Sequence, residues 1–145
     1  MAANLLSDIA NHVEFLGYKV TKKDETMYNA VPATPDANRL SFSIHLTDKG
    51  GLLFLAAFST TDNVKADQIG VLEFVNAGNV GAYTARFVWS GDYGIFIEGY
   101  YPSAYDKRAF GEFINTWLTE VTTFLNSDKA RVAKYIKSEE SKSSE

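Results

Sequence analysis

Residues 71–89, VLEFVNAGNVGAYTARFVW, decide the fold of this chain. The first half of the stretch is apolar with helical spacing, and the second half alternates apolar and polar residues as a strand does. We expect the helix to end at Gly78 in the left-handed conformation that glycine adopts without steric penalty. Asn76 and Asn79 flank this glycine. We interpret Asn76, Gly78 and Asn79 as a structural helix-end motif that holds the helix against the next strand.

The residues before this stretch predict one helix and several strands. Apolar side chains recur at helical spacing over residues 3–16, and Gly17 is placed to end that helix. Strand patterns follow at residues 18–21, 27–31, 40–46 and 52–58. The last of these, LLFLAAF, is apolar on both faces, whereas a strand with one wet face alternates. We therefore expect a helix of the same chain or another subunit to cover its second face.

The helix that enters the central stretch is expected over residues 65–77, with Ile69, Leu72 and Val75 on its apolar stripe. Two strands, residues 82–89 and 95–101, are joined by the hairpin turn SGDYG. A long helix follows, with an apolar stripe from Phe110 to Leu125. The fold class predicted is α+β: an antiparallel sheet with helices on one face, in the order α-β-β-β-α-β-β-α.

The length favours a single domain, which we expect to span residues 1–126. The remaining residues, 127–145, differ in composition from the domain. Residues 129–137 are basic and compatible with a short helix, and residues 138–145 contain only serine, glutamate and lysine. Such a composition cannot bury apolar surface, so we expect a disordered tail whose removal leaves the fold intact.

Composition narrows the function classes. The net charge of −4 disfavours binding to nucleic acid, because the phosphate backbone attracts basic surfaces. There is no cysteine, so disulfides and thiolate metal sites are excluded, as suits a protein of the reducing cytoplasm. Residues 1–20 do not resemble a signal peptide, and no apolar run reaches the roughly 18 residues of a membrane span. We expect a cytoplasmic protein without membrane contact.

No constellation of residues indicates catalysis, a metal site or a cofactor. Ser41, Ser43 and His45 share one strand face, but alternate strand positions are about 6.6 Å apart, whereas a serine and its base need about 3 Å. His12 is the other histidine, and no carboxylate pair lies at ligand spacing beside either one. We interpret the three strand residues as a polar solvent face. Arg86 and Glu98 are expected to face each other across the final hairpin as an exposed pair.

Several features of the chain, in residues 71–89 and beyond them, are similar to the YbjN family of proposed bacterial sensory transduction regulators. They are Leu72, Val75, Asn76 and Asn79 at the helix end, the Ala85-Arg86-Phe87 strand, the hairpin at residues 91–94 and the helix at residues 110–124. The resemblance implies a fold like that of type III secretion chaperones. It also implies a small, acidic homodimer that binds other proteins and catalyses no reaction, and it carries over no catalytic, metal or cofactor residues.

The function predicted is therefore a non-enzymatic protein-binding module, chaperone-like or regulatory, that acts as a homodimer. Its candidate partner or dimer surface is apolar and aromatic: Leu52, Phe54, Phe58, Trp89, Phe96 and Tyr100. The alternative is a small-molecule sensor with an aromatic pocket between the sheet and the C-terminal helix. A closed cavity lined by tyrosine and tryptophan would favour the sensor, and exposed apolar surfaces would favour the binding module.

Overall fold

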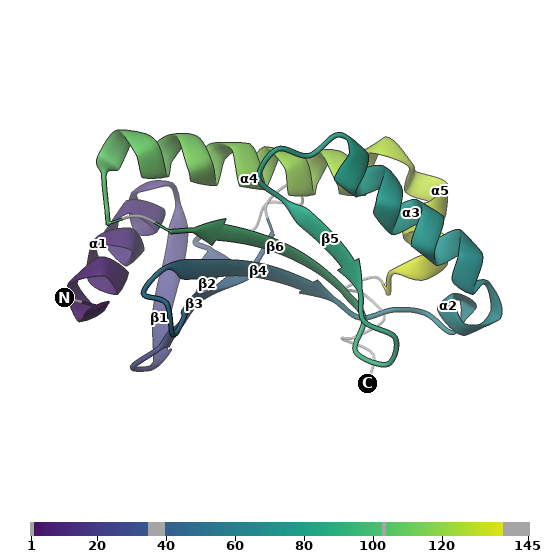
Figure 1. The fold of residues 1–145 in the computed structure, drawn as a ribbon, viewed down its shortest axis with the longest axis horizontal. Coiled ribbons are helices and arrows are strands. Elements are labelled where there is room, and N and C mark those ends of the chain that lie inside the picture. The colour runs from purple at the N-terminus through teal and green to yellow at the C-terminus, as the bar shows by residue number, and fades with distance from the viewer. Residues whose placement is uncertain (1, 35–39, 103, 138–145) are drawn as a thin grey trace.

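One antiparallel sheet forms the centre of the computed structural model, which describes residues 2–34, 40–102 and 104–137 (Figure 1). Its strands are β1 (Tyr18–Asp24), β2 (Met27–Pro32), β3 (Phe42–Leu46), β4 (Leu52–Phe58), β5 (Arg86–Trp89) and β6 (Ile95–Tyr101). They lie in the order β1-β2-β3-β4-β6-β5, and every neighbouring pair is antiparallel. Strands β1 and β5 are therefore the edges, and β4 lies inside the sheet.

The helices are α1 (Ala2–Phe15), α2 (Asn63–Ala66), α3 (Gln68–Val80), α4 (Lys107–Ser127) and α5 (Lys129–Tyr135). The long α4 runs along one face of the sheet, with α1 packed at one end of it and α3 at the other (Figure 1). The ring of His12 in α1 lies 4.9 Å from that of Phe110 in α4, so both helices share a face. The opposite face of the sheet carries no described helix.

The core lies between α4 and the sheet, and aromatic side chains fill it. Trp117 projects from α4 and packs edge-on against Phe42 of β3, with ring centroids 5.5 Å apart. Phe110 packs against Phe54 of β4 at 5.7 Å. A Cβ atom at Gly99 of β6 would lie 2.5 Å from the Trp117 ring, so glycine is what lets the helix approach the sheet this closely.

The α+β fold class is confirmed, with the helices on one face, but the predicted order is one strand short. Residues 18–24 and 27–32 form two complete strands of a hairpin, so four strands precede α2. Gly17 lies in the turn after α1 and has φ of 101°, in agreement with its predicted role at the end of that helix.

The predicted domain boundary after residue 126 falls too early, because α5 packs back onto the domain. Tyr135 is buried, and its ring lies 5.6 Å from that of Phe74 in α3. Ile136 is also buried and forms a bridge with Thr60 beyond the end of β4. The folded unit therefore includes residues 127–137. The tail predicted to be disordered, residues 138–145, lies outside the described residues.

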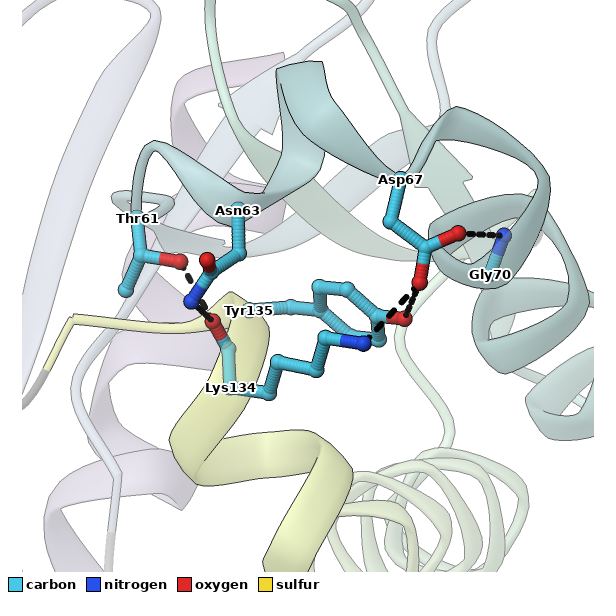
Figure 2. Close-up of polar contacts among 6 residues, drawn as sticks. All are labelled: Thr61, Asn63, Asp67, Gly70, Lys134 and Tyr135. Atoms are coloured by element: carbon cyan, nitrogen blue, oxygen red, sulfur yellow. Dashed lines mark hydrogen bonds and ion pairs between the residues drawn. The ribbon is translucent and has the colours of Figure 1, made fainter.

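Hydrogen bonds join α5 to the segment around α2 (Figure 2). One Asp67 carboxylate oxygen accepts from Gly70 N at 3.0 Å, and the other accepts from the Tyr135 hydroxyl at 2.8 Å and from Lys134 Nζ at 3.0 Å. The Tyr135 bond, followed by those of Lys134 and Gly70, lowers the pKa of Asp67. The hydroxyl of Thr61 and the amide of Asn63 both donate to the Lys134 carbonyl. These contacts hold α5 against the start of α3.

The prediction of a left-handed Gly78 is wrong. Helix α3 continues to Val80, its C-cap is Gly81, and Gly78 is not among the described glycines with positive φ. A Cβ atom at Gly78 would instead lie 2.8 Å from Phe87 and 2.9 Å from Phe124. The glycine is required there by close packing of α3 against β5 and α4, and not by a reversal of the chain.

Candidate protein-interaction surfaces

Strand β4 is apolar on both faces, but the protein's own helices cover only one of them. Phe54 and Ala56 point into the core, whereas Leu53 and Leu55 lie half-buried on the opposite side. The strand pairing places further apolar side chains on that side: Met27, Val31, Val88, Phe96 and Tyr100. We call this surface the open face. The sequence predicts that a helix of the same chain or another subunit covers the second face of β4. No described helix covers it, so the first of these alternatives is wrong, and cover by another subunit stays a prediction.

The surface residues predicted from the sequence divide between the two sides of the sheet. Leu52 and Phe54 are fully buried in the core, so the prediction that they form a partner or dimer surface is wrong. Both sides of β4 look alike in sequence, and only the position of α4 distinguishes them. Phe58 and Trp89 also lie on the helix-covered side and are half-buried. Phe96 is half-buried on the open face, and Tyr100 is 44% exposed there.

Polar side chains also lie on the open face. Arg86 and Glu98 pair across β5 and β6, as predicted. The Ser43 hydroxyl lies 2.7 Å from His45 Nε2, so the prediction that strand spacing keeps these two side chains apart is wrong. The two side chains lean toward each other from backbones that are two residues apart. Burial lowers the pKa of His45, against the opposing effect of Asp24.

The Ser43–His45 contact lacks the surroundings of a catalytic dyad. Among the described residues, no carboxylate hydrogen-bonds to His45 to orient its ring. Strand β3 is paired on both sides, so its backbone N–H groups take part in the ladders to β2 and β4 and not in an oxyanion site. We interpret the contact as mutual hydrogen bonding of two half-buried polar groups.

Helix α3 has a second apolar face, which the sequence pattern did not separate from the first. Val71, Phe74 and Val75 are buried, whereas Ile69, Leu72 and Val80 are 74%, 53% and 80% exposed. The expected grouping of Ile69 and Leu72 with Val75 is therefore wrong. The signal was present in the sequence, because apolar residues surround this helix instead of forming one stripe. We call Ile69, Leu72, Asn76 and Val80 the α3 outer stripe.

The two asparagines at the end of α3 differ in what they contact. The Asn79 amide donates to the Phe87 carbonyl at 2.8 Å and accepts from Phe87 N–H at 2.8 Å. It thereby occupies the outward-facing backbone groups of the edge strand β5, as a neighbouring strand would. Asn76 is exposed, and its amide makes no hydrogen bond within the described part of the chain. The structural role predicted for this pair thus has a visible basis at Asn79 alone.

A groove of about 710 Å³ lies beside α3, between its C-terminal half, the turn that follows and α4. The rings of Phe74, Phe87 and Phe124 form its apolar lining, and Tyr83 lies on its rim with 94% of its side chain exposed. Threonines of α4 contribute hydroxyl groups along one wall. The groove is open to solvent and contains no tryptophan, so it differs from the closed cavity expected of a sensor.

Glu120 of α4 fixes the turn beside this groove. Its carboxylate accepts hydrogen bonds from the backbone N–H groups of Tyr83, Thr84 and Ala85 and from the Thr84 hydroxyl. Burial raises the pKa of Glu120, but these bonds outweigh it and hold the pKa below its ordinary value. A carboxylate so engaged has little capacity left for a ligand or for acid–base chemistry. The sequence carries no local signal for this contact, which joins residues 35 or more positions apart.

A solved structure has the same fold as this chain. The chain superimposes on the crystal structure of YbjN from E. coli, a candidate transcription regulator, with a TM-score of 0.62 over 92% of this chain and 96% of that chain. The fold is that of YbjN. The two sequences are 12% identical, so the likeness is one of backbone architecture. No protein-family model matches the sequence, and a search of curated proteins finds no match.

The described residues contain neither a helix able to cross a membrane nor a cluster of metal-ligating side chains. None of the helices there combines the length and the apolar character needed to cross a bilayer. No group of three or more histidine, aspartate or glutamate side chains lies close enough together in that part of the chain to hold a metal ion.

Proposed function

We propose that the protein is a non-enzymatic protein-binding module, chaperone-like or regulatory, that acts as a homodimer. The observation that carries this proposal is the presence of two separate apolar surfaces, the open face and the α3 outer stripe, that the fold itself does not bury. Contiguous exposed apolar surface on a small domain is typical of interaction sites. A homodimer that binds a partner needs two such surfaces, one for the second copy and one for the partner.

The chemistry of the open face suits a protein segment. Leu53, Leu55 and Phe96 provide apolar contact, and the Arg86–Glu98 pair lies beside them as a polar rim. The fold shared with YbjN, a candidate regulator, agrees with a regulatory or chaperone-like role. We place this activity in the cytoplasm, without nucleic-acid or membrane partners, because the chain is acidic and free of cysteine.

The groove beside α3 supports the second candidate function, a small-molecule sensor. Its apolar rings and threonine hydroxyls form a lining of the kind that small ligands occupy, and its volume of about 710 Å³ suits a drug-sized molecule. Its openness to solvent and the full engagement of Glu120 favour the binding module over the sensor.

Site-specific cross-linking tests the proposed function. A photo-reactive amino acid is placed at Leu55 on the open face or, as a matched control, at Asn11 on the exposed side of α1. In the native cell we expect a discrete protein adduct from position 55 and none from position 11. The purified partner should then bind the wild-type protein and lose at least tenfold in affinity for Leu55→Glu. Equal adducts at both positions, or unchanged affinity of the variant, would contradict the proposal.

A further inference from the structure

The groove beside α3 has an aromatic end and a polar end. The residues of α4 that line it recur every three or four positions over residues 112–127, so it follows about 22 Å of that helix. At one end the ring of Phe124 lies 4.5 Å from that of Phe74 and 4.6 Å from that of Phe87. At the other end the α4 residues are polar: Glu112, Asn115, Thr116, Thr119 and Glu120.

The polar end carries negative charge. Burial opposes ionisation of Glu120, but its hydrogen bonds outweigh burial and hold its pKa below the ordinary value. Glu112 pairs with Arg108 at 3.4 Å, and because both side chains are exposed this pair is weak. Arg131, the basic residue of the lining, lies at the aromatic end, where Asp128 accepts from its Nε at 2.6 Å. The charge left without a close partner in the groove is therefore negative.

The ring of Tyr83 lies beside this negative charge. The Tyr83 backbone N–H donates to the Glu120 carboxylate, so the residue is held at the polar end by a fixed turn. Tyr83 is nevertheless 94% exposed, so the core does not use its ring. An aromatic face attracts a cation through its quadrupole, and a nearby carboxylate attracts it through its charge. Together they form surroundings that favour an organic ammonium group.

We propose that this groove binds an amphipathic organic amine, whose apolar part lies against the phenylalanine rings and whose ammonium group lies between Tyr83 and the polar end. The hydroxyl of Thr116 and the amide oxygen of Asn115 can accept its N–H bonds. Thr116 and Phe124 are about 12 Å apart along α4, so a chain of several atoms must separate the two parts of the ligand. The inference rests on the second candidate function, the sensor, for which it names the ligand class.

Three probes of similar shape and different charge test this ligand class: phenylbutylammonium, phenylbutanol and phenylbutyrate. NMR titration of the isotope-labelled full chain measures their affinities, and the amides of Gly78 and Thr119 report on the two ends of the groove. We expect phenylbutylammonium to bind about tenfold more tightly than phenylbutyrate, with phenylbutanol between them. Equal affinities, a preference for phenylbutyrate, or no shift at either amide with any probe would overturn the inference.

A pair of tyrosine variants tests the position of the ammonium group. Tyr83→Ala removes the ring at the groove, and Tyr93→Ala is the matched control, because Tyr93 is 80% exposed in the turn between β5 and β6. Both variants should keep the circular dichroism spectrum of the wild type. Tyr83→Ala should weaken binding of phenylbutylammonium about threefold and affect phenylbutanol less, whereas Tyr93→Ala should change neither. Equal affinities of the two variants for phenylbutylammonium would overturn the inference.

The outcomes separate this inference from both candidate functions. A groove that prefers phenylbutyrate overturns the inference and leaves a sensor of a different ligand standing. The protein-binding proposal is tested at Leu55, which does not line the groove. Loss of the Leu55 adduct would therefore contradict that proposal alone, and a preference for phenylbutylammonium would still support the inference.

Discussion

Phe54 and Leu55 are neighbours in β4, and Leu72 and Phe74 lie two residues apart in α3, yet only one member of each pair belongs to the core. Phe54 and Phe74 are buried, whereas Leu55 is half-buried on the open face and Leu72 is 53% exposed. Both elements are apolar on two sides, and the protein's own packing uses one side of each. The difference teaches that the surplus apolar side, and not the core, is where an interaction surface should be sought.

The largest effect should come from exchanging the two members of the β4 pair for alanine. Phe54→Ala should lower the free energy of unfolding by about 3–5 kcal/mol, because it leaves a cavity between β4 and α4. Leu55→Ala should lower it by no more than about 1 kcal/mol. Urea unfolding at low protein concentration measures both. Equal losses of stability for the two variants would show that the same chain covers the open face, which would contradict the distinction between the two sides of β4.

A second test concerns the inner side of α3. Gly78→Ala should lower the free energy of unfolding by about 1–3 kcal/mol, because its Cβ would press on the rings of Phe87 and Phe124. Gly81→Ala is the matched control, since no atom lies within 4 Å of the added Cβ and the residue has φ of −98°. That control should stay within about 0.5 kcal/mol of wild type. If the two variants unfold alike, α3 does not pack on β5 as described.

The two asparagines at the end of α3, Asn76 and Asn79, should also differ in their contribution to the free energy of unfolding, by a smaller amount. Asn79→Ala should cost about 1–2 kcal/mol, because it leaves the N–H and carbonyl of Phe87 without their partner. Asn76→Ala should cost no more than about 0.5 kcal/mol in dilute solution, where the dimer contributes little. Denaturant melts of both variants provide the measurement. A larger loss of stability for Asn76→Ala than for Asn79→Ala would contradict the prediction that Asn79 is the structural residue of the pair.

The smallest change in the free energy of unfolding is expected when the pH is lowered. Burial lowers the pKa of both His12 and His45 below the ordinary value of 6.5. The unfolded chain therefore binds protons more readily than the folded one, and the free energy of unfolding should fall as pH drops from 7 through 6.5 toward 5. His12→Gln and His45→Gln should each flatten this dependence in urea melts. A stability that is constant or rises over this interval would be inconsistent with burial of neutral histidines.

The sequence predicted the fold class because periodicity reports it directly. The apolar stripe of α4, the turn at Gly17 and the final hairpin with its Arg86–Glu98 pair all follow from local patterns. What it could not assign is which side of a doubly apolar element faces the core, because that depends on contacts between distant residues. For this reason the sequence pattern predicts a surface position for Leu52 and a core position for Ile69, whereas Leu52 is buried and Ile69 is 74% exposed.

The same dependence on contacts between distant residues explains why the predictions for Gly78 and for the domain boundary after residue 126 are wrong. Gly78 in the sequence is compatible either with a helix end or with a close helix contact, and only the positions of Phe87 and Phe124 decide between them. The α5 segment is short and basic, and the burial of Tyr135 against Phe74 is visible only in three dimensions. Local chemistry therefore predicted the elements, and long-range packing decided the roles of the surfaces between them.

The central claim is that the apolar surface left over by folding serves self-association and partner binding. Multi-angle light scattering of the purified full chain across the micromolar range tests it most directly. We predict a mass of twice the 16.1 kDa of one chain, with Leu72→Glu shifting the species to the monomer mass while the circular dichroism spectrum stays unchanged. A wild-type protein that remains at 16.1 kDa at every concentration would contradict the account.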